Sequence, residues 1–326
     1  MSDYGREVTD AYESTHSSDF VHVDSAAESL APQLAGASAF GGQGGEDLDT
    51  VKRKLGFGFW LAIGWIVTVV LAAILAPWLP IKDPDANLIQ PGERPPYAPS
   101  SEFWFGSDLD ARDMFSRTIW GARISLTIGF SAIAFGMLVG GSLGMVAGYF
   151  RSKWDTAISF FFVVLLSFPA LVLAILITAL LDRTLFTISF VIGVLSIAPV
   201  GRVSRATTIS FADREFVLAA KSLGARHPRI IIRELLPNVV IPMAALALLG
   251  VAVAIVAEGG LAFLGLSVEK GATWGKLILF GSGSRDLEKA PWISMAPIMV
   301  LFFTVLALNF AGDRLRDYFD VKEASL

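Results

Sequence analysis

Long runs without charged side chains are the feature of this 326-residue chain that most restricts its fold. A helix that crosses the hydrocarbon core of a membrane needs about 20 consecutive apolar residues, and its backbone groups must pair within the span. Six runs are long enough or nearly so: Phe57–Leu79, Ile124–Phe150, Thr156–Leu181, Leu185–Gly201, Val239–Ala257 and Pro291–Gly312. They predict an all-α membrane protein with six transmembrane helices. The fourth run is the shortest and contains Pro199, so it is the weakest of the six.

Composition supports this interpretation, because 54% of the residues are hydrophobic and only 17% are charged. Residues 1–50 differ from the rest: they hold ten acids and one base, and are rich in Ser, Ala and Gly. We expect this acidic segment to be a disordered tail, either without chemistry of its own or with a regulatory or docking role. The chain has no cysteine, which excludes a disulfide framework and a thiolate metal site.

The distribution of Lys and Arg indicates the orientation of the spans. If the N-terminus lies inside, sixteen of the 26 basic residues fall in inner segments, and Lys52–Lys54 directly precede the first span. Basic residues prefer the cytoplasmic side. We therefore expect a multi-pass protein of the cell (inner, or cytoplasmic) membrane with both termini in the cytoplasm. Residues 80–120 would then be extracytoplasmic, and residues 202–238 would be cytoplasmic.

The second run carries a glycine at every fourth position. On a helix, small residues at this spacing form one stripe, along which a neighbouring helix can approach closely. The stripe predicts helix packing, not a phosphate-binding loop. It consists of Gly136, Gly140, Gly144 and Gly148.

The inner segment 202–238 is polar enough for the membrane surface, yet it is patterned. Asp213 is a candidate cap for a short helix with Glu215 in its first turn. Gly224 stands where a left-handed residue would end that helix. We expect a second segment, Ile230–Leu236, which Pro237 closes before the fifth span. The small residues Ala219, Ala220 and Gly224 form a face that could fit closely into the groove of another protein.

This segment resembles the EAA motif of binding-protein-dependent ABC importer permeases. The matching residues are Glu215, Ala219, Ala220, Gly224, Leu236 and Pro237, with Glu234 where the family pattern has Ile. In that family the loop docks into a cleft on the ATPase subunit. The resemblance therefore implies that these six residues couple the permease to ATP hydrolysis.

Three further stretches resemble the C-type subunit of the dipeptide and oligopeptide permease family. The first precedes the second span and contains Ala111 where the family usually has Gly; the last contains Val321 where the family has Pro. The resemblance as a whole runs from about residue 52 to residue 323. The matching residues are Gly106-Ser107-Asp108, Arg112-Asp113, Ser116-Arg117 and Gly121–Leu126; Glu258 with Phe263–Leu266; and Asn309, Gly312-Asp313, Leu315–Asp317 and Asp320.

The resemblance implies a type I ABC importer permease (MetI-like) core. The expected organisation is a tail at 1–50, a first helix and extracytoplasmic segment at 51–120, a permease core at 121–313 with the coupling loop 202–238, and a cytoplasmic tail at 314–326. Expected partners are a second, homologous permease forming a heterodimer, two cytoplasmic ATPases, an extracytoplasmic substrate-binding protein and the lipid bilayer, but no nucleic acid. ATP and Mg would bind the ATPases, with no cofactor or metal in this chain.

Three polar residues near the outer ends of the spans are candidates for the translocation pathway or a gate: Glu258, Arg112 and Asp113. Glu258 is an ionisable group inside an apolar run, and such groups usually face a partner or a cavity. It could form a structural hydrogen bond, line the pathway or reach headgroup water.

Enzymatic chemistry is disfavoured by what the sequence lacks. None of the three histidines lies in a span, and there is no G-x-x-x-x-G-K-[ST] phosphate loop. We therefore expect a non-catalytic permease that imports di- and oligopeptides. The same architecture could import nickel, glutathione or oligosaccharides. A secondary transporter or channel is a further alternative, but the spans are nearly free of the ionisable groups that would bind a coupling ion.

Overall fold

The computed structural model describes residues 56–92 and 94–324, and these described residues belong to one compact unit. The acidic segment 1–50 and the Lys52–Lys54 cluster lie outside the described residues. Every regular element of the described residues is a helix, and the only strand-like pairing among them is an isolated bridge between Ser107 and Asp113. The all-α prediction is confirmed.

Five continuous helical segments are long and apolar enough to cross a membrane. The second contains a π-helical turn in its middle, and the fourth contains one directly after its first three residues. The segments are α2 (Gly56–Leu75); α3 (Met114–Gly136) with η1 (Met137–Gly141) and α4 (Ser142–Phe150); α7 (Leu185–Ala212); α9 (His227–Arg229) with η2 (Ile230–Leu235) and α10 (Leu236–Phe263); and α13 (Trp292–Ala324).

The third expected span is not one straight helix. It consists of α5 (Lys153–Ser167) and α6 (Ala170–Leu180), which meet at an angle of 83°. Phe168 is extended at the break because the ring of Pro169 disfavours a helical conformation in the preceding residue. The spans thus number five, or six if this pair crosses the membrane as one broken span.

The fourth span, which the sequence marks as the weakest, is a single helix that is long enough to cross a membrane. Helix α7 has 28 residues, and Pro199 lies inside it without ending it. The expected inner segment 202–238 therefore begins as a continuation of this helix. The boundaries expected at 120 and 313 likewise fall inside helices α3 and α13, because both helices run past the ends of the apolar runs.

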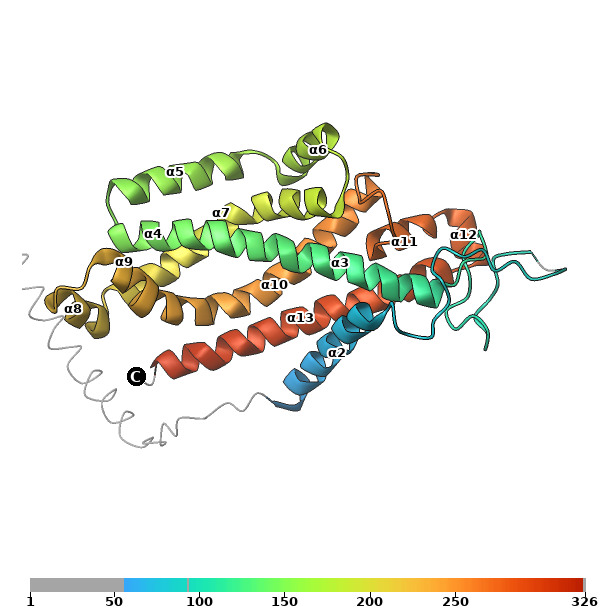
Figure 1. The fold of residues 1–326 in the computed structure, drawn as a ribbon, viewed down its shortest axis with the longest axis horizontal. Coiled ribbons are helices and arrows are strands. Elements are labelled where there is room, and N and C mark those ends of the chain that lie inside the picture. The colour runs from blue at the N-terminus through green and yellow to red at the C-terminus, as the bar shows by residue number, and fades with distance from the viewer. Residues whose placement is uncertain (1–55, 93, 325–326) are drawn as a thin grey trace, which may run out of the picture. The chain divides into compact units, whose positions relative to one another are not determined.

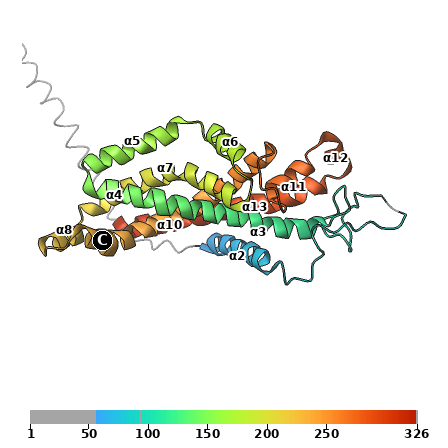
Figure 2. The same ribbon diagram turned by 45° about the horizontal axis from the view of Figure 1, so that its top comes forward.

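The helices form a bundle with two distinct ends (Figures 1 and 2). Helix α8 (Glu215–Ser222) lies at one end, together with the end of α4 and the C-terminal part of α13. We call this the α8 end. The opposite end, the loop end, contains residues 76–113, α11 (Trp274–Phe280) and α12 (Ser284–Lys289). The broken pair α5–α6 leads from the α8 end towards the start of α7 at the other (Figure 2).

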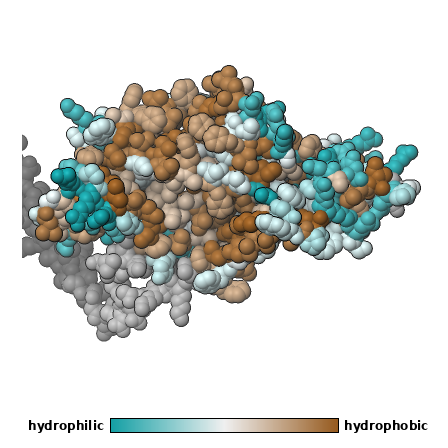
Figure 3. All heavy atoms as spheres, in the orientation of Figure 1, coloured by the Kyte–Doolittle hydropathy of each residue, from teal (hydrophilic) through white to brown (hydrophobic). Residues whose placement is uncertain are grey.

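The core lies where α3, α7 and α10 meet, and it contains the fully buried side chains of Ile128, Ile188 and Ile255. The outer faces are apolar too: Phe160 and Val163 on α5 and Leu138 on η1 are mostly exposed. Figure 3 shows these apolar residues as a broad belt along the bundle, with polar residues gathered towards both ends. Because lipid tails are as apolar as these side chains, close packing between helices decides the arrangement within the belt.

Candidate functional site

The short helix α8 protrudes from the α8 end of the bundle immediately after α7. It starts at Glu215, and Arg214 is the residue at its N-cap, without a side-chain cap. The expectation that Asp213 caps this helix is wrong. Asp213 instead ends α7, and its carboxylate accepts a hydrogen bond of 2.7 Å from Arg151, which follows α4. The Asp213 carboxylate is thus paired with a residue 62 positions away in the sequence and does not cap the helix that follows it.

Helix α8 ends in a Schellman motif built on Gly224, as the sequence predicts. Gly224 has φ +76°. The Ala225 N–H donates to the Ala220 carbonyl and the Gly224 N–H donates to the Lys221 carbonyl, each at 3.0 Å. A Cβ on Gly224 would meet no atom within 4 Å, so the backbone conformation and not the space around it favours glycine here.

One side of α8 is anchored and the other is bare. Val217 is fully buried and shares a hydrophobic cluster with Ile230 and Leu235 of the following helix. On the outer side, Leu223 is 88% exposed and Leu218 is 50% exposed. Glu215, Ala219 and Gly224 are also exposed, and Ala220 is half-buried. Helix α8 is thus fixed to the bundle on one side, and its other side presents an apolar surface that no described residue covers.

The segment after Gly224 differs from the expectation. Pro237 does not close a separate helix: α9, η2 and α10 form one continuous segment, His227–Phe263. Pro237 lies in the first turn of α10, directly after the π-turn Ile230–Leu235, where proline is well tolerated. Leu236 and Pro237 are exposed, and His227 is hydrogen-bonded to Tyr149 of α4 at 2.8 Å. Helix α8 is therefore separated from the fifth expected span only by the short turn around Gly224.

The four glycines of α3–α4 all lie against α7. A Cβ at Gly136 would come within 2.8 Å of the Ser196 side chain, and one at Gly148 within 2.7 Å of the Arg205 carbonyl. At Gly140 and Gly144 the obstacles would be the backbone carbonyls of Ile197 and Gly201. The residue numbers of the α7 contacts rise together with those of the glycines, so the two helices run parallel. Backbone cannot move aside as a side chain can, so larger residues at these positions would separate the helices.

Glu258 is fully buried near the end of α10. The Ser267 hydroxyl donates to its Oε1 at 2.6 Å, and Oε2 has no hydrogen-bond partner among the described residues. The expected alternative of exposure to headgroup water is wrong. The contact with Ser267 favours a structural role, in which Glu258 holds the chain after α10. Lys276 of α11 lies nearby: burial lowers the pKa of its ammonium group, and the charge of Glu258 opposes this shift.

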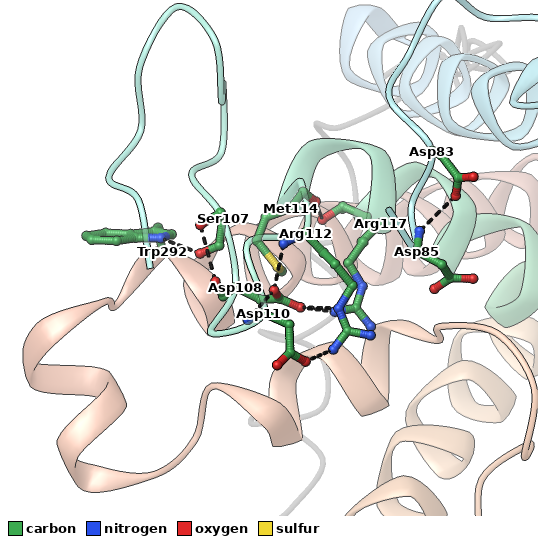
Figure 4. Close-up of polar contacts among 10 residues, drawn as sticks. Asp83, Asp85, Ser107, Asp108, Asp110, Arg112, Met114, Arg117 and Trp292 are labelled. Atoms are coloured by element: carbon green, nitrogen blue, oxygen red, sulfur yellow. Dashed lines mark hydrogen bonds and ion pairs between the residues drawn. The ribbon is translucent and has the colours of Figure 1, made fainter. Parts of the chain in front are cut away.

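Arg112 and Asp113 make separate polar contacts at the start of α3, and those of Arg112 are shown in Figure 4. Asp113 is the N-cap of α3, and it accepts hydrogen bonds from the Ser116 N–H at 2.8 Å and the Ser116 hydroxyl at 2.7 Å. Asp108 accepts from the Arg112 N–H and side chain, at 2.8 and 3.0 Å, and is ion-paired with Arg117. These contacts hold the loop on the start of α3.

The sequence assigns Asp108, Arg117 and Ser107 only to a motif and predicts no contact for them. In the structure Asp108 and Arg117 form a buried ion pair, with 6% and 5% of the residues exposed. The Ser107 carbonyl accepts a hydrogen bond of 3.0 Å from Trp292 at the start of α13, 185 residues away (Figure 4). One signal in the sequence points to this ion pair. Many charged residues stand directly before an apolar run, and charged side chains must be paired if they are buried.

Comparisons with known proteins agree with this arrangement. Residues 140–323 match the protein family described as binding-protein-dependent transport system inner membrane component. The dipeptide transport system permease protein DppC of Alkalihalophilus pseudofirmus is 38% identical over 266 residues, which are 80% of this chain and 84% of that protein. A putative peptide permease protein of Brucella ovis is 34% identical over 259 residues, covering 78% and 84%.

The fold also has a counterpart among solved structures. A chain of the MetNI methionine ABC transporter, in an inward-facing conformation, superposes with a TM-score of 0.51 and covers 63% of this chain and 97% of that chain. The identity is 16%, so the likeness concerns the fold alone. It supports the expected MetI-like core.

Proposed function

Because this chain belongs to the family of binding-protein-dependent transport system inner membrane components, and is thus a non-catalytic permease subunit of an ABC importer, we propose that it imports di- and oligopeptides. The proposal for the substrate rests on the relatives named as dipeptide and peptide permeases, which align with about four fifths of the chain. The family works with ATPase and substrate-binding partners. We further propose that this subunit pairs with a second, homologous permease and with two ATPases, which supply the ATP and Mg sites.

The observation that carries the coupling proposal is the bare outer surface of α8. Leu223 and Leu218 expose apolar side chains beyond the end of the spans, while Val217 fixes the same helix to the bundle. Exposed apolar groups at a rigid position favour a protein partner. We assign the coupling role to Glu215, Ala219, Ala220, Gly224, Leu236 and Pro237. When ATP closes the ATPase pair, the motion of α8 would pass into α10.

The coupling proposal is tested by Gly224→Leu. A residue with a Cβ is costly at φ +76°, so the turn should shift and α8 should leave its docking position. We expect uptake of a labelled dipeptide to fall by about tenfold or more, equivalent to about 1.4 kcal/mol of coupling, while the complex still assembles in the membrane.

The matched control is Gly92→Leu at the loop end. Gly92 also has a positive φ, +85°, and a Cβ there would likewise meet no atom within 4 Å. This variant carries the same local strain but should keep normal uptake. Normal uptake and normal substrate-stimulated ATP hydrolysis in Gly224→Leu would refute the coupling assignment.

The substrate is tested separately by competition. We expect unlabelled di- and tripeptides to compete with the labelled dipeptide, and nickel, glutathione and oligosaccharides not to do so. Competition by one of the latter alone would replace the substrate class but leave the permease assignment intact.

We also propose that the α8 end faces the cytoplasm and the loop end the opposite side. Single cysteines at Ser101 and Ser222 test this in a chain without native cysteine. Both positions are exposed, one at each end. A membrane-impermeant maleimide should label Ser101→Cys in sealed cells, and Ser222→Cys only after the membrane is opened. Labelling of Ser222→Cys in sealed cells would invert the topology.

A further inference from the structure

A cleft of ≈ 890 Å³ lies at the loop end, between the chain that follows α2, the second and third turns of α3, the first residue of α7 and the loop before α11. Its volume is within the range of small-molecule sites. The walls are mixed. Apolar side chains line part of it, among them Leu79, Ile124 and Leu185, and charged groups of both signs line the rest.

Three basic residues line the cleft, and two of them, Arg123 and Lys270, are exposed. The Arg123 guanidinium lies 5.6 Å from the centroid of the Trp120 ring, which keeps it at the wall of the cleft. Neither side chain forms an ion pair within the described residues. Lys82 also lines the cleft, but its ammonium donates to the Glu102 carbonyl at 2.6 Å. Two basic groups are thus available to an anion.

The cleft also presents two acids, Asp83 and Asp85. They lie on one short turn, where the Asp83 carboxylate accepts the Asp85 N–H at 2.9 Å (Figure 4). Both residues are exposed. With acids and bases on its lining, the cleft complements a headgroup that carries both charges better than a purely anionic one.

The position of the cleft matches the surface of the membrane. Ala76 and Pro77 directly follow the apolar helix α2, and Leu185 begins α7, so the cleft lies at the ends of two spanning helices. Next to it, Ile74 is 55% exposed and Trp78 is 76% exposed. Tryptophan and long basic side chains at the ends of spanning helices are typical of the membrane–water interface, where lipid headgroups lie.

We propose that this cleft binds a phospholipid whose headgroup carries a phosphate and a primary ammonium, such as phosphatidylethanolamine. Arg123 and Lys270 bind the phosphate, and Asp83 and Asp85 accept hydrogen bonds from the ammonium. An acyl chain lies on the exposed apolar residues at the end of α2. The cleft lies at the opposite end of the bundle from α8 (Figure 1).

The test uses the purified importer complex with added phosphatidylethanolamine, phosphatidylglycerol or phosphatidylcholine, and counts retained lipid by native mass spectrometry. We expect selective retention of phosphatidylethanolamine. The variant Arg123→Gln/Lys270→Gln should retain about tenfold less, because two charge-assisted hydrogen bonds are lost. The matched control Arg285→Gln/Lys289→Gln removes two exposed bases from α12 at the same end and should retain lipid normally. Asp83→Asn/Asp85→Asn should abolish the preference over phosphatidylglycerol.

Four outcomes would overturn the proposal. The first is equal retention of all three lipids by the unaltered complex. The second is equal loss of lipid in the α12 control. The third is displacement of the lipid by inorganic phosphate, which would make the cleft a site for a soluble anion. The fourth is an unchanged lipid count in Arg123→Gln/Lys270→Gln together with lost stimulation of ATP hydrolysis by the binding protein, which would make the cleft a protein-docking surface.

Discussion

The two ends of the bundle satisfy their polar and apolar groups in opposite ways. At the loop end, charged groups are buried and paired within the chain: Asp108 and Arg117 are about 95% buried, and Trp292 binds the backbone of Ser107. At the α8 end, the ion pair Arg151–Asp213 is exposed, and Leu223 is 88% exposed. The junction between the loop and α3 is therefore held by contacts within this chain, whereas the outer surface of α8 is suited to contact with another protein.

The difference has a physical reason. A buried ion pair is costly to break, so it fixes one arrangement of the loop on α3. The exposed apolar surface of α8 contributes little to the fold of its own chain, and it becomes buried only when a partner binds. The predictions below test this contrast by similar changes at the two ends.

The largest expected effect is at the loop end. Arg117→Met removes the guanidinium and leaves Asp108 buried with only Arg112 as a charged partner. Breaking a buried pair from one side costs about 3–5 kcal/mol. We therefore expect a clear fall in the thermal unfolding temperature of the detergent-purified complex. Arg285→Met, which removes an exposed base of α12 at the same end, should leave that temperature unchanged. Equal stability of the two variants would show that the loop end does not depend on its buried pair.

The second effect belongs to the α8 end and should appear in transport, with stability unchanged. Leu223→Ser removes an apolar side chain that makes few contacts in this chain but is available to the ATPase. We expect uptake to fall by about fivefold to tenfold, as for the loss of one well-buried leucine contact worth about 1–1.5 kcal/mol at an interface. The unfolding temperature of the isolated permease should not change.

The matched control for Leu223→Ser is Leu109→Ser. Leu109 is 50% exposed, and it lies at the loop end. The chemical change is the same, so a nonspecific effect of a surface serine would appear in both variants. If both lowered uptake equally, the α8 surface would have no special role.

The sequence was sufficient where a structural feature depends on neighbouring residues. The left-handed turn at Gly224 follows from local backbone geometry, and the spacing of four residues places Gly136–Gly148 on one face of a helical segment. The fold class follows from the lengths of the apolar runs. Each of these properties is encoded within one helix or turn.

The sequence was insufficient where a distant residue decides. Asp213 has the chemistry of a helix cap, but Arg151 reaches it from α4. The break at Phe168 was open to prediction from Pro169, yet Pro199 and Pro237 lie within continuous helical segments. Whether a proline ends a helix depends on how its surroundings satisfy the freed carbonyl, which a single sequence does not reveal. The pairing of Asp108 with Arg117 similarly required the fold of the loop.

A third prediction compares the ion pairs directly. Asp213→Asn removes the charge of an exposed pair, in which the side chains of Arg151 and Asp213 are 40% and 69% exposed. Exposed pairs contribute about 0.2–1 kcal/mol. The shift in unfolding temperature should therefore be several times smaller than that of Arg117→Met, and it should shrink further at high salt. A loss as large as that of Arg117→Met would remove the contrast between the two ends.

The smallest expected effect concerns Ala111, which replaces the glycine usual in the resembling permeases. Its φ is +59°, which costs a residue with a Cβ about 1–2 kcal/mol. The same Cβ is fully buried in a cluster with Tyr97 and Phe103, where one methyl group contributes about 0.8 kcal/mol. Glycine would relieve the strain but lose the methyl contact and increase the freedom of the unfolded chain by about 0.4–1 kcal/mol.

These terms nearly cancel, so Ala111→Gly should change the unfolding free energy by less than about 1 kcal/mol. Ala111→Val is the variant to compare with Ala111→Gly. A β-branched side chain is a genuine outlier at positive φ, and the buried site leaves it little room. We expect Ala111→Val to lower the unfolding temperature clearly while Ala111→Gly leaves it almost unchanged. If valine were tolerated as well as glycine, the loop would be free to rearrange, and the rigidity inferred for the loop end would be wrong.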